Sequence, residues 1–159
     1  MKTLIIGIGN PGRGDDGLGP ALVERLAEVE KGSLAEGAVV EAPGGISAVW
    51  KYQLNIEDAH LIKDFDAVVF ADAAIDGESV RLAELTPAAA ITFTTHELSP
   101  GAVLALADEL YGKAPAGWLL SMPGRDWELG AGLSEPAGEQ LDKAEALLRE
   151  WLAKDRNSV

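Results

Sequence analysis

A glycine-rich segment close to the start of the chain constrains the fold more than any other stretch. It runs from Gly7 to Gly19 with the sequence GIGNPGRGDDGLG, and it follows the short apolar run from Leu4 to Ile8. An amphipathic stretch over residues 20–30 comes after it. A buried strand, a glycine turn and a helix in this order form the first half of a β-α-β unit. Ligands of open parallel sheets bind beyond the carboxyl ends of the strands, so the sequence predicts a binding site at this turn.

The chemistry of the turn favours a cation over a phosphate. The glycine spacing from Gly7 to Gly12 fits the dinucleotide fingerprint, but Pro11 lacks the N–H that a phosphate cradle needs. Asp15 and Asp16 place negative charge where the phosphate would bind, at the start of the expected helix. A P-loop would continue with Gly-Lys-Ser or Gly-Lys-Thr, which is not present. A carboxylate pair suits a metal ion, and the alternative is that Asp15 or Asp16 caps the helix.

Composition narrows the class of protein. The chain has 159 residues, a net charge of −13 and no cysteine. We expect a single domain over residues 1–159, with no disulfide, no thiolate metal site and no cysteine nucleophile. The acidic balance argues against nucleic acid and anionic membranes as partners. Because no signal peptide and no membrane-spanning run is evident, we expect a cytoplasmic protein, and the lack of a spare apolar stripe favours a monomer.

The remaining apolar runs alternate with amphipathic stretches, which is typical of an α/β fold. We predict a three-layer sandwich with a mostly parallel twisted sheet of about five strands, one antiparallel edge strand and helices on both faces. Residues 38–42 are ambiguous, because Pro43, Gly44 and Gly45 interrupt the run. The other strands are expected within Ser47–Gln53, Ala67–Ala71, Val80–Glu84, Ala90–Thr94 and Gly117–Ser121, and the other helices at 56–65, after Ser99 and after Ser134.

Three polar residues follow separate predicted strands. Asp16 follows the first strand, Asp72 follows the run Ala67–Ala71, and His96 follows the run Ala90–Thr94. The carboxyl ends of parallel strands meet at one edge of a sheet, so these residues are expected to share a site. Two carboxylates and an imidazole suit a borderline divalent ion such as nickel or zinc.

Each of the three residues also has a purely structural interpretation. In this interpretation Asp16 is a helix cap, Asp72 caps a turn, and His96 only orients the helix that follows. The other histidine, His60, lies within an expected helix and receives no role. No Gly-x-Ser-x-Gly elbow and no His-Glu-x-x-His motif occurs, so the commonest serine and zinc hydrolase layouts are excluded.

Several motifs together resemble those of the hydrogenase maturation proteases. The main stretches that carry this resemblance are GIGN at 7–10, DDGLG at 15–19, the strand ending in Asp72-Ala73, and THELSP at 95–100. Further similar stretches are YQL at 52–54, YG at 111–112, PG at 123–124 and WELGAGLS at 127–134. The resemblance therefore covers nearly the whole chain in the same order. The sequence departs from the family between Ser33 and Ile46, and Tyr52 stands where members often have histidine.

The resemblance implies an endopeptidase that removes a C-terminal extension from the large subunit of a nickel–iron hydrogenase after nickel insertion. The metal-contacting positions of the family correspond to Asp16, Asp72 and His96, which are then both catalytic and metal-binding. The enzyme holds no tightly bound cofactor of its own, because the nickel is supplied by the precursor. A metal polarises the scissile carbonyl or activates water, and a carboxylate acting as general base is an equal alternative.

Three other functions are alternatives to this one. A non-catalytic nickel-checking chaperone would bind the same precursor without cutting it. A Rossmann-like nucleotide-binding module would bind NAD or ATP. The opening motif also resembles that of peptidyl-tRNA hydrolase, but that enzyme needs a Thr-Arg-His-Asn run where this chain has GDDG at 14–17, and the acidic charge is unsuited to tRNA.

Overall fold

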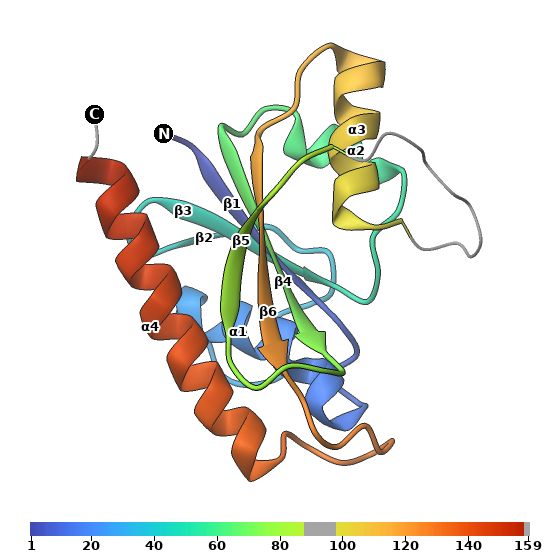
Figure 1. Cartoon of the computed structure of the whole chain (residues 1–159), viewed down its shortest axis with the longest axis vertical. Coiled ribbons are helices and arrows are strands. Elements are labelled where there is room, and N and C mark those ends of the chain that lie inside the picture. Colours follow the sequence, from blue (N-terminus) through green and yellow to red (C-terminus); the bar gives the residue numbers. More distant parts are fainter. Residues whose placement is uncertain (88–97, 158–159) are drawn as a thin grey trace.

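A six-stranded sheet in the order β2-β3-β1-β4-β6-β5 forms the centre of the molecule (Figure 1). The computed structural model describes residues 1–87 and 98–157. Strands β3, β1, β4 and β6 run parallel, whereas β2 and β5 pair antiparallel with β3 and β6. The strands are β1 Thr3–Ile8, β2 Val40–Ala42, β3 Ile46–Lys51, β4 Ala67–Ala74, β5 Arg81–Leu85 and β6 Ala116–Pro123.

The helices pack on the two faces of this sheet. They are the short 3-10 helix η1 Gly14–Gly17 and the α-helices α1 Leu18–Ala27, α2 Glu57–Ile62, α3 Pro100–Tyr111 and α4 Glu135–Asn157. Helices α1 and α4 cover one face, and α2 and α3 cover the other. The predicted α/β sandwich is confirmed. Among the described residues no helix is sufficiently long and apolar to span a membrane.

The sheet has one more antiparallel edge strand than the sequence predicted. We expected about five strands and one antiparallel edge, but the described residues contain six strands with an antiparallel strand at each edge. The difference is β2, because Pro43-Gly44-Gly45 is a hairpin turn rather than an interruption. Gly44 and Gly45 have φ angles of 93° and 76°, a conformation that glycine adopts at little cost. The strand expected over Ala90–Thr94 lies outside the described residues.

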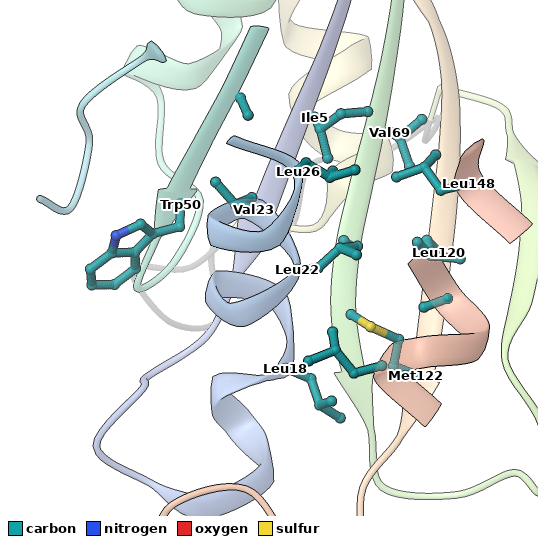
Figure 2. Close-up of a cluster of buried hydrophobic side chains, with 14 of the residues drawn as sticks. Ile5, Leu18, Leu22, Val23, Leu26, Trp50, Val69, Leu120, Met122 and Leu148 are labelled. Atoms are coloured by element: carbon teal, nitrogen blue, oxygen red, sulfur yellow. The ribbon is translucent and has the colours of Figure 1, made fainter. Parts of the chain in front are cut away.

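Two apolar cores hold the layers together. Strands β1 and β4 are buried on both faces, which explains their unbroken apolar sequence. On one face, side chains of α1 and α4 pack with Ile5, Val69 and Leu120 (Figure 2). On the other face, side chains of α2 and α3 pack with Leu4, Ile6, Val68 and Phe70. The core therefore fixes β1 and β4 firmly, and the turn after β1 starts from a rigid strand.

The ends of α3 confirm the predicted caps, whereas the start of α1 corrects a prediction. Ser99 accepts a hydrogen bond from the N–H of Ala102 at 3.1 Å, and Gly112 ends α3 in a left-handed conformation, as the sequence predicted. In contrast, α1 has no side-chain cap, so the alternative that Asp15 or Asp16 caps it is wrong.

Candidate functional site

The turn after β1 brings Asp16 back against the end of its own strand. Gly9 has a φ of 141°, and a Cβ there would collide with the carbonyl oxygen of Asp16. Gly19, at the start of α1, packs on the backbone of Ile8 and Ala71 with no room for a side chain. The two glycines thus permit backbone contact between the turn and the strands. This close packing sets where Asp16 lies relative to β1 and β4.

Asp16 lies in η1 and is half-buried. Its Oδ2 accepts a hydrogen bond from the N–H of Asn10 at 2.8 Å, and the N–H of Asp16 donates to the carbonyl of Arg13 at 3.1 Å. Its Oδ1 lies beside Gly9. One carboxylate oxygen is therefore engaged in holding the turn, which orients the carboxylate at the carboxyl edge of the sheet.

Asp72 lies at the same edge, on the neighbouring strand. It stands in register with Ile8 of β1 and with Ser121 of β6. It is half-buried and forms an interaction within the structure. The sequence placed Asp72 at the point where the strand ends, but β4 continues to Ala74. Asp72 comes two residues after Phe70 and four after Val68. Since every second side chain of a strand points to the same face, Asp72 belongs to the sheet face that α2 and α3 cover.

The two predicted carboxylates therefore both lie at the end of β1. Asp72 is the register partner of Ile8, and Asp16 contacts Gly9, the next residue along the chain. Adjacent strands are about 4.8 Å apart, so Asp72 and the end of β1 are direct neighbours. In Figure 1 the arrowheads of β4 and β6 point to the end of the molecule that holds the turn after β1. This arrangement agrees with the expected convergence of strand ends.

His96, the third predicted residue, lies outside the described residues. The described residues resume at Leu98, which is buried and donates its N–H to the carbonyl of Leu54 at 3.2 Å. Within residues 1–87 and 98–157, no group of three or more acidic or imidazole side chains is arranged to hold a metal ion. The trio of Asp16, Asp72 and His96 stays a prediction. Two carboxylates and an imidazole are donors that fit nickel.

A cation stands on the other side of Ile8. Lys51, at the end of β3, is the second register partner of Ile8. Its Nζ lies 2.9 Å from Oδ1 of Asp58, a fully buried carboxylate at the start of α2. The N–H of Asn55 also donates to Oδ2 of Asp58 at 2.8 Å. Lys51 is thus neutralised locally.

Asp15, which the sequence pairs with Asp16 as a cation ligand or a helix cap, has neither role in the structure: it binds a distant loop. Its carboxylate is completely buried and accepts hydrogen bonds from the loop after β6 and from Ser134. Burial acts to raise the pKa of Asp15, but the donors from Ser134, Arg125 and Asp126 outweigh it and lower the pKa below its usual value. No local pattern signals this role, because its donors lie 110 to 119 residues away.

A groove of about 320 Å³ opens beside the same turn, on the α1 face. Its lining includes Gly14 and Gly17 of the turn, and Trp50 and Tyr52 from β3 and the segment that follows it. Tyr52 is 55% exposed and meets the ring of Trp50 edge-on, with 5.0 Å between ring centroids. Other lining residues are Pro11, Pro20, Ala21, Glu24, Lys31, Gly32, Leu34, Gly132 and Leu133. The groove is mainly apolar, and it adjoins the turn that carries Asp16.

Comparisons with known proteins identify the class to which this fold corresponds. No protein-family model and no curated protein sequence matches the chain. Solved structures match it over nearly its full length, and they include several hydrogenase maturation proteases. The fold is therefore the one predicted from the motif resemblance.

Three of these structures illustrate the match. The [NiFe] hydrogenase maturation protease HycI from Thermococcus kodakarensis KOD1 is 26% identical, with a TM-score of 0.64 over 96% of this chain and 92% of its own. The hydrogenase maturating endopeptidase HybD from E. coli is 18% identical, with a TM-score of 0.67 over 98% and 94%. A hydrogenase 2 maturation peptidase from Thaumarchaeota archaeon SCGC_AB-539-E09 is 24% identical, with a TM-score of 0.60 over 96% and 98%.

Proposed function

We propose that this chain is an endopeptidase that removes the C-terminal extension of a nickel–iron hydrogenase large-subunit precursor after nickel insertion. The observation that carries the proposal is the placement of both Asp16 and Asp72 at the end of β1, where η1 also packs against β4. That placement occurs in a fold shared with hydrogenase maturation proteases. The motif THELSP at 95–100 supplies the third expected residue, His96.

Nickel in this proposal is part of the substrate. Asp16, Asp72 and His96 contact the nickel that the precursor carries, so the enzyme acts only where nickel has been inserted. The ion, when held, polarises the scissile carbonyl or lowers the pKa of bound water toward about 7. The residues of this chain orient the precursor, and a carboxylate of the trio accepts a proton from the attacking water in the alternative route.

The apolar groove supports the same proposal from a second direction. It lies next to the turn that carries Asp16, and Tyr52 at its rim leaves aromatic surface exposed. A peptide segment of the precursor requires such a surface, because apolar side chains provide most of the binding energy in clefts of this kind. We assign the groove to the polypeptide that flanks the cleavage position.

The test is the mass of the precursor after incubation with the purified protein. A nickel-loaded large-subunit precursor from the same organism should lose its C-terminal extension, and a nickel-free precursor should stay intact. His96→Ala should abolish cleavage while the circular dichroism spectrum stays unchanged. A stable complex with an uncut precursor would instead identify a nickel-checking chaperone, and saturable binding of NAD or ATP would support a nucleotide-binding module.

A further inference from the structure

The buried carboxylate of Asp15 joins two segments that are distant in sequence. Its Oδ2 accepts from the N–H of Arg125 at 2.7 Å and from the N–H of Asp126 at 3.0 Å. Ser134 donates twice, from its N–H to Oδ1 and from its hydroxyl to Oδ2, both at 2.7 Å. A carboxylate with none of its surface exposed is normally paired with a cation, but here neutral N–H and O–H donors surround it.

The connection runs in both directions. The N–H of Asp15 donates to the carbonyl of Asp126 at 2.7 Å, and the N–H of Gly14 donates to the carbonyl of Ala131 at 3.0 Å. Earlier in the turn, the carbonyl of Gly12 accepts from the N–H of Gly130 at 2.8 Å. The turn over residues 12–15 and the loop over residues 125–134 therefore form one hydrogen-bonded unit at the carboxyl edge of the sheet.

Asp16 is the next residue after this unit. Its carboxylate accepts from Asn10 on the opposite side of the turn, so the two adjacent acids are directed to different partners. Asp15 faces inward to the loop after β6, and Asp16 stays half-buried at the edge. Any change that releases Asp15 lets the turn shift, and Asp16 shifts with it.

We propose that Asp15 is a positioning residue that holds Asp16 in place by fastening the turn after β1 to the loop before α4. The inference rests on the proposed function, because it assigns a task to Asp16. A displacement of about 1 Å at a reacting group costs on the order of 10²-fold in rate. The loop over 125–134 thereby contributes to catalysis without supplying a group to the reacting atoms.

The variant Asp15→Asn tests the proposal, because it keeps the size of the side chain and turns an NH₂ group toward N–H donors. We expect kcat on the nickel-loaded precursor to fall by at least about tenfold, with KM changed by less than about threefold. Ser134→Ala removes one donor and should give a smaller loss of kcat, which Ser134→Thr should restore. Rates are compared at a temperature where every variant is folded.

The matched control is Leu148→Ala, which destabilises the buried face of α4 but touches neither the turn nor the loop. It should be at least as unstable as Asp15→Asn and should keep its kcat. Equal losses of kcat in the two variants would reduce Asp15 to a general stabilising residue and overturn the proposal. Wild-type kcat in folded Asp15→Asn would overturn it as well.

A second measurement separates this inference from the proposed function. Hydrogen exchange of the Asn10 amide reports the contact to Asp16 directly, whatever reaction the protein catalyses. Exchange of this amide should accelerate at least about tenfold in Asp15→Asn and stay unchanged in Leu148→Ala. If the wild-type protein leaves the precursor uncut, the proposed function fails, and the Asn10 amide alone decides on Asp15. Unchanged protection in Asp15→Asn would reject the positioning role.

Discussion

Two fully buried carboxylates stand near the carboxyl edge of the sheet, and they are stabilised in different ways. Asp58 forms an ion pair with Lys51 and accepts from the nearby N–H of Asn55. Asp15 has no cation among its partners in the described part of the chain, and accepts from the N–H groups of a remote loop and from Ser134. Asp58 belongs to the α2 face, whereas Asp15 fastens the turn to the N-terminus of α4.

The two kinds of partner predict different tolerance to substitution at Asp58 and Asp15. An ion pair neutralises a charge that the fold already buries, and its replacement by neutral groups of similar size is often nearly neutral for stability. A carboxylate held by several backbone N–H groups cannot be replaced so simply, because the donors stay buried and unsatisfied. We therefore expect the Asp15 unit to tolerate substitution less well than the Asp58 pair.

The largest effect is expected from Asp15→Asn. The amide retains one acceptor oxygen and opposes the remaining donors, so the free energy of unfolding should fall by about 4 kcal/mol. Urea denaturation followed by far-UV circular dichroism measures this change. A loss below about 1 kcal/mol would mean that the loop over residues 125–134 adapts, and the contrast with Asp58 would disappear.

The next effect is expected from Lys51→Met, which leaves Asp58 buried without its cation. The free energy of unfolding should fall by about 3 kcal/mol. The double variant Lys51→Met/Asp58→Asn should recover most of this loss, because an amide at position 58 still accepts from the N–H of Asn55. If the double variant is as unstable as the single one, the stability of this pair does not come from neutralising the charge.

A smaller loss of stability is expected from Ser134→Ala, and it should exceed the loss from removing an ordinary helix cap. Ser134→Ala removes the hydroxyl that accepts from the N–H of Ala137 at 3.3 Å and donates to Asp15. We expect the free energy of unfolding to fall by about 2 kcal/mol. Ser99→Ala removes only the cap of Ala102 and should cost about 1 kcal/mol. Thermal unfolding of the two variants gives the difference. Equal costs would show that the hydroxyl of Ser134 contributes nothing to the Asp15 unit.

The smallest effect is expected at an exposed carboxylate. The side chains of Lys63 and Lys113 lower the pKa of Asp64 from 3.8 to about 2. Because the pKa is lower in the folded state, Asp64 stabilises the fold above pH 3.8, and this contribution disappears as the pH falls toward 2. Wild type and Asp64→Asn should differ only slightly in acid unfolding, and added salt should remove the difference. A salt-independent difference would contradict the surface interpretation.

The sequence predicted those parts of the fold that depend on local pattern. The turn from Gly7 to Gly19, the apolar strands and the caps of α3 all follow from short stretches. Strand β2 is ambiguous in the sequence because three residues give little periodicity, and only the pairing of Val40–Ala42 with β3 identifies it. Pairing across a sheet is a tertiary property, so no local signal distinguished a hairpin turn from an interruption.

The candidate site was predictable only where topology determines it. Asp16 and Asp72 were selected because parallel strand ends share an edge, and register with Ile8 agrees with that choice for Asp72. Asp15 could not be assigned in this way, since its partner Ser134 is 119 residues away and both residues occur in ordinary capping contexts. The neighbouring sequence is compatible with Asp15 as a helix cap, but in the structure the loop after β6 and Ser134 offer its carboxylate more hydrogen-bond donors than a helix end does.

Under the proposed function, acids at the carboxyl edge of the sheet act on a precursor that carries nickel. The most direct measurement is the single-turnover rate of tail removal from nickel-loaded precursor, followed by mass, for Asp16→Asn and Asp72→Asn against Glu84→Gln. Glu84 is exposed near the other end of the sheet, so its substitution removes the same charge far from the site. We predict losses of at least about 100-fold for the first two variants and an unchanged rate for Glu84→Gln. Wild-type rates in folded Asp16→Asn and Asp72→Asn would contradict the claim.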